Sequence, residues 1–186
     1  GALAMAMRGT AALAMWWNVA AEVRPEFEQW HTHEHLRERL GIAGFCRASR
    51  WTAADGGEGI FMLYELESYA TLSSPGYLAR LNAPTPWSTR MMPHHRDMVR
   101  SQCRVLHSAG GVSARQALTV RLSPASAQAA AGLQAGLAAL GATLVDRPGL
   151  VGAHLLQHQA PAIAPTTEQR IRGGDAVADW VLLATG

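Results

Sequence analysis

Three histidines fall within the segment WHTHEHLRERL, which runs from Trp30 to Leu40. Histidine exchanges a proton near neutral pH, and it is the commonest metal ligand in proteins. On a regular helix His31 and His35 share one side, whereas His33 points about 160° away from each of them. Three imidazoles in this arrangement cannot converge on one metal ion, and the HExxH spacing of zinc proteases is absent. The segment therefore favours proton transfer, or a structural hydrogen-bonding role, over metal binding.

Helical periodicity and family resemblance predict different histidines for the side that faces the protein interior. On a helical wheel of this segment the apolar arc, about 120° wide, contains Trp30, Leu36 and Leu40. His33 falls within that arc, which favours His33 as the inward-facing residue. The family resemblance described below favours His35. A neutral imidazole between a helix and a sheet can act as an acid or a base, so both histidines are candidate catalytic residues.

A third candidate catalytic residue is Asn18, which ends an apolar stretch just before the charged segment. A polar side chain at the end of a strand can reach a cavity between a sheet and its covering helices. The alternative is a turn residue, because asparagine suits turns. Both interpretations are compatible with the sequence.

Four further residues are candidates for binding a substrate: Trp30, Trp87, Arg90 and His94. The two tryptophans can supply aromatic walls, or they can simply pack in the core. Arg90 and His94 are four residues apart and share a face if their helix survives Pro93. Such a pair can hold a carboxylate, although the same spacing also suits a solvated helix face.

The composition excludes several classes of protein. The net charge is +2, and the 16 basic residues form no cluster of the kind that nucleic-acid-binding proteins carry. No apolar run approaches the roughly 18 residues of a membrane span. The apolar opening resembles a secretory signal but is interrupted at Arg8 and Gly9, which favours a cytoplasmic protein. Glycine-rich phosphate loops, GxSxG elbows and flavin or nicotinamide fingerprints are absent. We therefore expect a small-molecule ligand in a mostly apolar pocket, with no cofactor.

The elements that must position these residues follow an order known from other proteins. The spacing of apolar residues and the positions of turn-forming residues predict a strand at 11–19 and a helix at 26–40. They also predict a hairpin of two strands at 45–53 and 60–68. Helical stretches are predicted at 68–82 and 85–100, with breaks at Pro75 and Pro93, and a strand at 101–109. The resulting order, β-α-β-β-α-β, is the ferredoxin-like plan.

The pattern then partly repeats after Gly110 and Gly111. Strand-like sequence at 114–123 is followed by an Ala- and Leu-rich helix at 124–148, a strand at 149–159, a polar loop and a last strand at 179–186. A diverged and shortened second copy accounts for this order. We therefore expect one repeat at residues 11–109 and a second at 113–186. The alternative is one mixed domain without repeats.

Two stretches of the sequence resemble a known family. The first is WHTHEHL, with Trp30, Glu34, His35 and Leu36, and the second is GIAGFCRASRW, from Gly41 to Trp51. They resemble the dimeric α/β-barrel superfamily, in particular its EthD-type and muconolactone-isomerase-like members. The resemblance covers residues 12–108. Residues 114–186 resemble the family only in the order of their predicted strands and helix. Several relatives carry proline after the EHL motif, whereas position 37 is arginine here, which leaves the local helix geometry open.

In this superfamily two ferredoxin-like units pack sheet against sheet, between two chains or within one. The resemblance implies an α+β fold of tandem ferredoxin-like repeats, with antiparallel sheets, helices on the outer face and a shortened second repeat. It implies cofactor-independent acid/base chemistry of the isomerase, monooxygenase or decarboxylase type on a small organic metabolite. The alternative is a non-catalytic protein that binds a small ligand or haem. Open strand edges predict a homodimer.

Overall fold

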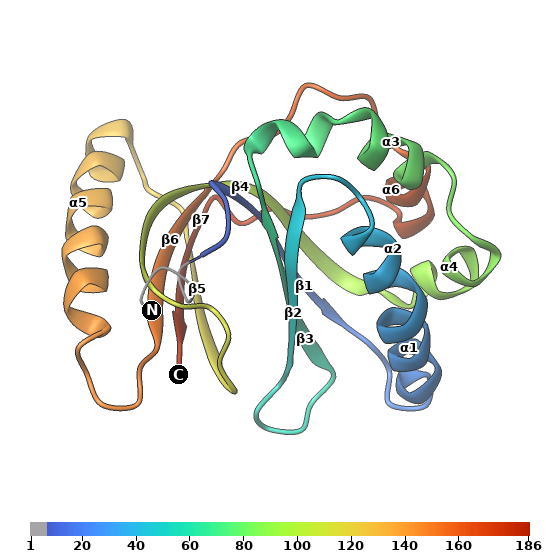
Figure 1. The fold of residues 1–186 in the computed structure, drawn as a ribbon, viewed down its shortest axis with the longest axis horizontal. Helices are drawn as coiled ribbons and strands as arrows, with labels where there is room; N and C mark the ends of the chain where they lie inside the picture. Colours follow the sequence, from blue (N-terminus) through green and yellow to red (C-terminus); the bar gives the residue numbers. More distant parts are fainter. Residues whose placement is uncertain (1–6) are drawn as a thin grey trace.

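The computed structural model describes residues 7–186 and contains one seven-stranded sheet in the order β2-β3-β1-β4-β6-β7-β5. Every neighbouring pair of strands is antiparallel. The strands are β1 (Ala11–Asn18), β2 (Phe45–Thr52), β3 (Gly59–Leu66), β4 (Arg96–Gly110), β5 (Ala117–Leu122), β6 (Gly152–His158) and β7 (Trp180–Thr185). The long strand β4 bends and belongs to both halves of the sheet, so that the sheet curls into an arch (Figure 1).

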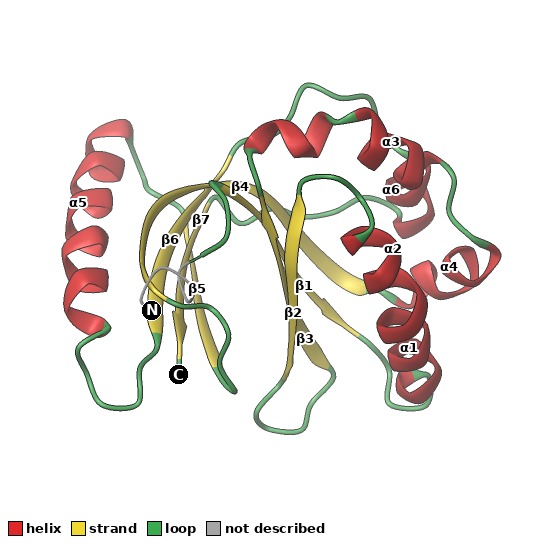
Figure 2. Cartoon of the chain, viewed as in Figure 1, coloured by secondary structure: helices red, strands yellow, loops and turns green. Residues whose placement is uncertain are grey.

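Helices cover the outer side of the arch (Figures 1 and 2). One half is covered by the helices of the N-terminal part together with α6, and the other half by α5 alone. The helical elements are α1 (Arg24–Trp30), the π-helix η2 (His31–His35), α2 (Leu36–Leu40), the 3-10 helix η3 (Tyr69–Ser73), α3 (Pro75–Asn82), α4 (Pro86–Met91), the 3-10 helix η4 (Met92–His94), α5 (Ala127–Leu144) and α6 (Thr167–Arg172).

Both faces of the sheet are buried at β1 and β3, because the side chains of these strands alternate between two hydrophobic clusters. On β1, Leu13, Met15 and Trp17 pack beneath the helices. The side chains between them point to the opposite face, where a second cluster fills the inside of the arch. There the Trp16 indole N–H donates to the hydroxyl of Thr119 on β5, at 3.0 Å. This contact between distant strands shows how far the sheet curls.

The chain is therefore an α+β protein with a curled antiparallel sheet and outer helices, as expected. The prediction of helix at 85–100 is wrong beyond Pro93, because β4 begins at Arg96. The first half has the strand order β2-β3-β1-β4, and the second contributes β6-β7-β5. Tandem repeats with boundaries at 11–109 and 113–186, and a homodimer formed through open strand edges, stay predictions.

One segment of the second half crosses over to the helices of the first half. This crossover segment, residues 159–179, contains α6, which the sequence analysis assigned to a loop. α6 begins with a capping box formed by Thr166 and Gln169 and ends at Gly173 in the left-handed conformation. It is tied to α3 through the Thr167 backbone N–H, which donates to the Asn82 side chain at 3.2 Å. Its side chains therefore reach the space beneath the first-half helices.

Across residues 7–186, the helices are all too short or too polar to cross a bilayer. The apolar opening considered above as a secretory signal begins in residues 1–6, which lie outside the described part of the chain.

Candidate functional site

The histidines of the π-helical turn η2 divide between the interior and the solvent. The Leu36 backbone N–H donates to the His31 carbonyl, five residues back, so this turn is wider than an α-helical turn. His31 and His35 are buried, whereas His33 is exposed to solvent. The helical-wheel prediction that His33 faces the sheet is wrong, because the buried side of the helix carries Phe27, Trp30 and Arg39 with these two histidines, whereas Leu40 of the apolar arc is 44% exposed. The prediction that His31 and His35 share one side is confirmed, with their rings stacked at 5.4 Å.

His35 lines a small enclosed cavity between the helices and the sheet, which we call the inner chamber, of ≈ 20 Å³. Arg39, one helical turn further on, lines it as well, and Tyr64 enters from β3. Arg100 on β4 and Glu168 on α6 complete its polar wall. Residues from both halves of the chain therefore meet behind the first helix.

Two buried polar atoms at the inner chamber lack a hydrogen-bond partner within residues 7–186. They are Nδ1 of His35 and the hydroxyl of Tyr64. Buried polar groups are nearly always hydrogen-bonded, and exceptions require an explanation. The His35 ring is held in place against Trp30, with 4.7 Å between ring centroids. An oriented imidazole and phenol without partners can donate to, or accept from, a bound molecule.

The buried histidines of this region are neutral at physiological pH. Burial lowers the pKa of His35 well below its ordinary value, and the nearby Arg39 cation lowers it further. Burial and then Arg50 lower the pKa of His31 in the same way. Burial lowers the pKa of His95, which also lines the chamber, to about 3. The Met92 carbonyl accepts a hydrogen bond from Nδ1 of His95 at 3.0 Å, which leaves Nε2 as the proton-accepting nitrogen.

These lowered pKa values predict that acid destabilises the protein. Below pH about 6.5 the unfolded chain binds more protons than the folded one, so the free energy of unfolding falls as pH falls. For His95 the window runs from about 6.5 down to its folded pKa of about 3. Each fully buried histidine contributes a slope of up to about 1.4 kcal/mol per pH unit. Urea denaturation between pH 7 and pH 4 measures the slope.

Two variants test whether His95 causes this pH dependence of the free energy of unfolding. His95→Asn keeps an amide donor for the Met92 carbonyl but cannot titrate, so it should flatten the pH dependence. His33→Asn alters an exposed histidine and should leave the slope unchanged. Equal slopes in all three proteins would show that His95 does not control acid stability.

The charges around the inner chamber do not cancel. The Arg39 guanidinium donates to both carboxylate oxygens of Glu168, at 2.8 and 2.7 Å. Arg172 forms a two-fold hydrogen-bonded pair with Asp175, at 3.0 and 2.9 Å. Arg100 is 5% exposed, and its one side-chain hydrogen bond goes to the Tyr77 hydroxyl at 2.6 Å. Within residues 7–186 it has no carboxylate partner, so the site holds an uncompensated positive charge.

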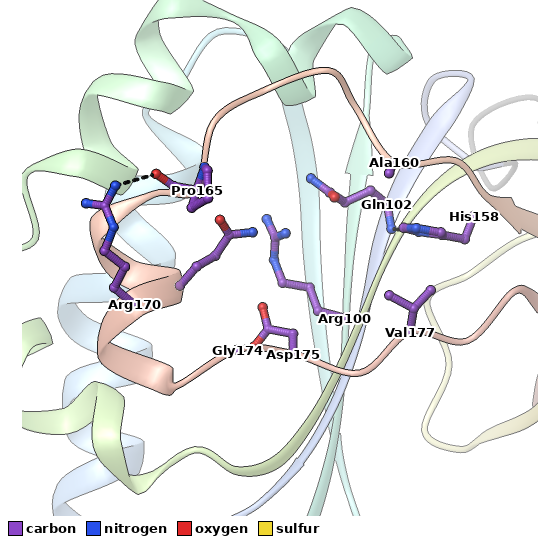
Figure 3. Close-up of a pocket in the computed structure, with 10 residues that line it drawn as sticks. Arg100, Gln102, His158, Ala160, Pro165, Arg170, Gly174, Asp175 and Val177 are labelled. Atoms are coloured by element: carbon purple, nitrogen blue, oxygen red, sulfur yellow. Dashed lines mark hydrogen bonds between the residues drawn. The ribbon is translucent and has the colours of Figure 1, made fainter.

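A larger cavity of ≈ 380 Å³, the outer chamber, lies beneath the crossover segment and shares Arg100 with the inner chamber. Figure 3 shows Arg100 and Gln102 extending from β4 into this space, with Pro165 of the crossover segment on the far side. Its volume falls in the range typical of small-molecule sites, about 300–1,000 Å³. The outer chamber can hold the body of a ligand that the inner chamber is too small to enclose.

Of the predicted site residues in the N-terminal part, His35 lines the inner chamber, whereas Trp30 packs behind the His35 ring and lines neither chamber. Trp30 is fully buried, donates to the Ser88 hydroxyl at 3.1 Å and supports the His35 ring. Asn18 does not reach the chamber. It follows Trp17 on the strand and so points to the opposite face, where it donates to Asp97 at 3.0 Å. The prediction that Asn18 enters the cavity is therefore wrong.

The predicted carboxylate clamp of Arg90 and His94 does not form. The α4 helix ends at Met91, so the two residues do not share one helix face. Arg90 instead makes an exposed ion pair with Glu26 at 3.3 Å. His94 is half-buried in the following 3-10 helix, and the neighbouring His95 is the histidine that enters the chamber. Trp87 packs against the helix-side core rather than lining either chamber.

Several polar residues of the site were not singled out from the sequence: Arg39, Tyr77, Arg100, Gln102, Glu168 and Arg172. A four-residue step from His35 leads to Arg39, and a two-residue step along a strand leads from Arg100 to Gln102. The capping box at Thr166 could have indicated α6, which carries Glu168 and Arg172.

Among residues 7–186, no group of three or more His, Cys, Asp or Glu side chains is arranged to hold a metal ion. The polar groups of the site are imidazole, phenol, guanidinium and amide groups, together with the carboxylates of Glu168 and Asp175, which are paired with arginines. They can exchange protons and stabilise an anion.

The fold is shared with solved structures of low sequence similarity. A "putative monooxygenase" from Fusobacterium nucleatum subsp. nucleatum matches with a TM-score of 0.56 and 9% identity, over 96% of this chain and 76% of that chain. A "putative monooxygenase" from Lactobacillus acidophilus matches with a TM-score of 0.59 and 5% identity, over 95% and 76%. An "anthrone oxidase-like protein" matches with a TM-score of 0.59 and 13% identity, over 95% and 72%.

These likenesses show that the chain shares its fold with these solved structures. No known family profile and no curated protein matches the sequence. The finer resemblance to EthD-type members stays a prediction.

Proposed function

We propose that the protein is a cofactor-independent enzyme of the monooxygenase type that oxidises a small phenolic or enolisable molecule with molecular oxygen. The observation that carries this proposal is the pairing of an unpartnered His35 imidazole and Tyr64 phenol in a buried chamber beside the unpaired Arg100 cation. The names of the structural neighbours agree with oxygen chemistry, as do the buried neutral histidines.

In this proposal the residues divide the work between proton transfer and charge stabilisation. The neutral imidazole of His35 accepts a proton from the acidic C–H or O–H of the substrate. Arg100 attracts and holds negative charge on the substrate beside His35, because cations in a site of low dielectric act strongly on negative charge. Tyr64, whose pKa is raised by burial, stays protonated and donates a hydrogen bond to the reduced oxygen. Trp30 holds the His35 ring against rotation.

The overall reaction balances without an external reductant. A substrate methylene activated by neighbouring phenol groups loses two hydrogens and gains one oxygen atom as a carbonyl. The second oxygen atom leaves as water with those two hydrogens, and the substrate supplies all four electrons that reduce O₂. The body of the substrate lies in the outer chamber, and its reacting edge faces His35 across the wall that Arg100 contributes to both chambers.

Oxygen uptake tests this proposal. Metal-free and flavin-free protein is mixed with a dihydroxyanthrone, and oxygen consumption is followed beside quinone absorbance. We expect one O₂ per quinone formed, at a rate well above the buffer control, and no oxygen returned on adding catalase because water is the by-product. Hydrogen peroxide as the product, or no acceleration with anthrones and simple phenols, would exclude monooxygenase-type oxidation of this substrate class. Isomerisation or decarboxylation of an enolisable acid is the runner-up chemistry for the same residues.

The proposal requires no haem. The inner chamber, into which His35 points, is far too small for a porphyrin, so hemin added to the protein should give no shift of the Soret band. Spectrophotometric titration at micromolar concentration measures this. A saturable Soret shift lost in His35→Ala would instead favour the haem-binding alternative.

A further inference from the structure

The outer chamber collects hydrogen-bond donors that have no acceptor. Arg100 and Gln102 occupy alternate positions on β4 and therefore point to the same side of the sheet. Gln102 is 7% exposed, and its side-chain Nε2 has no hydrogen-bond partner within residues 7–186. Arg100 donates only to the Tyr77 hydroxyl, although a guanidinium carries five N–H groups. Buried donors in this state indicate a missing acceptor.

The neighbouring residues show that the acceptor carries one negative charge. Asp175 also lines the outer chamber, but Arg172 already neutralises it. Arg170 reaches the chamber rim, where it donates to the Pro165 carbonyl at 3.1 Å and stays exposed. The buried charge that needs a counter-ion is thus that of Arg100 alone. A lone buried cation is costly unless it is paired.

The shape of the donors and walls favours a carboxylate. A guanidinium presents a planar fork of N–H groups that matches the two oxygens of a carboxylate. The remaining lining includes the apolar side chains of Ala160, Pro165 and Val177, which suit a hydrocarbon or aromatic body. His158 adds a half-buried imidazole, whose Nδ1 accepts the backbone N–H of Gln102 at 2.9 Å and whose Nε2 is thereby left as the donor.

We propose that the outer chamber is a binding site for the carboxylate group of the substrate, held by the Arg100 guanidinium and the Gln102 side-chain amide. This inference rests on the proposed function, for which it names the substrate class: an aromatic or enolisable acid with a single carboxylate. Arg100 walls both chambers, so an acid bound there has its body next to the inner chamber and its reacting edge toward His35.

Titration calorimetry with naphthoate and naphthamide tests the inference without any turnover. The two probes have nearly the same shape, and only the first carries a charge. Naphthoate should bind wild-type protein at least about tenfold more tightly than naphthamide, the preference expected for a charge-assisted, two-fold hydrogen bond. Arg100→Met should abolish the preference, and Gln102→Leu should weaken naphthoate binding several-fold while leaving naphthamide binding unchanged.

Two controls separate this result from the proposed function. Arg90→Met removes an exposed arginine outside both chambers and should retain the full preference. His35→Ala should also retain it, because binding of the carboxylate does not require proton transfer. Equal affinity of wild-type protein for the two probes, or an unchanged preference in both Arg100→Met and Gln102→Leu, overturns the carboxylate site. If Arg100→Met does not fold, Arg100→Lys and Gln102→Leu decide the question, since lysine keeps the charge but loses the planar fork.

Discussion

Replacing His35 by alanine should lower the rate of oxygen-dependent turnover by about 10²–10⁴-fold, the range typical of losing a positioned acid or base. His35 is the imidazole whose Nδ1 has no partner in the inner chamber. Removing it leaves the substrate anion without the group that generates it. Steady-state oxygen consumption with a dihydroxyanthrone measures the loss, and affinity measured without oxygen should stay within a few-fold of wild type.

The matched control is two residues away. His33 belongs to the same π-helical turn but is exposed to solvent, so His33→Ala should retain at least half of the wild-type rate. The pair therefore distinguishes catalysis from a general effect on the helix. Equal rates in wild type and His35→Ala would remove His35 from the mechanism, and so would equal losses in the two variants.

Replacing Glu168 by glutamine should destabilise the protein by up to about 3–5 kcal/mol, the cost of breaking a buried ion pair, because Arg39 then keeps Glu38 as its carboxylate partner at 3.1 Å but loses its two-fold bond to Glu168. Both Arg39 and Glu168 are almost fully buried, at 3% and 2% exposure. Burial alone lowers the pKa of Arg39, but the Glu168 carboxylate outweighs it and raises that pKa above its ordinary value. The same pair links the crossover segment to α2. Urea denaturation at pH 7 measures the change in the free energy of unfolding.

An exposed ion pair provides the comparison. Glu26→Gln breaks the pair with Arg90 on the surface and should cost less than about 1 kcal/mol. Replacing Arg39 and Glu168 together by methionine should recover most of the lost stability, because neither member of this pair is then left buried without the other. A loss below about 1 kcal/mol in Glu168→Gln would show that water reaches the pair and that the crossover segment is not anchored there.

The alternation of side chains along the strands could be predicted, and with it much of the sheet. The stretch AALAMWWN is short, apolar and contains two tryptophans, and it forms β1. Its alternate side chains enter the two hydrophobic clusters on the opposite faces of the sheet. The first half of β4 was mistaken for helix because Met98, Arg100 and Gln102 follow a helix-like stretch that in fact ends near Pro93. Their alternation is a strand signal, but it is short and interrupted by charges.

The site was less predictable, for two physical reasons. The buried side of the first helix carries His31, His35 and Arg39 rather than its leucines, so apolar periodicity selected the side of His33 instead. The resemblance indicated His35 where periodicity did not. In addition, the partner of Arg39 is Glu168, 129 residues away, so the pair depends on a crossover that only the folded chain defines.

The most direct test of the account is to follow labelled oxygen through one turnover. Protein free of metal and flavin is given a dihydroxyanthrone under ¹⁸O₂, and the quinone is analysed by mass spectrometry. For wild type and His33→Ala we predict one labelled oxygen atom in each quinone molecule, located in the newly formed carbonyl. With His35→Ala we predict no product above the buffer control. Unlabelled quinone from wild type, or labelled quinone formed as fast by His35→Ala, would contradict a monooxygenase reaction that depends on the inner chamber.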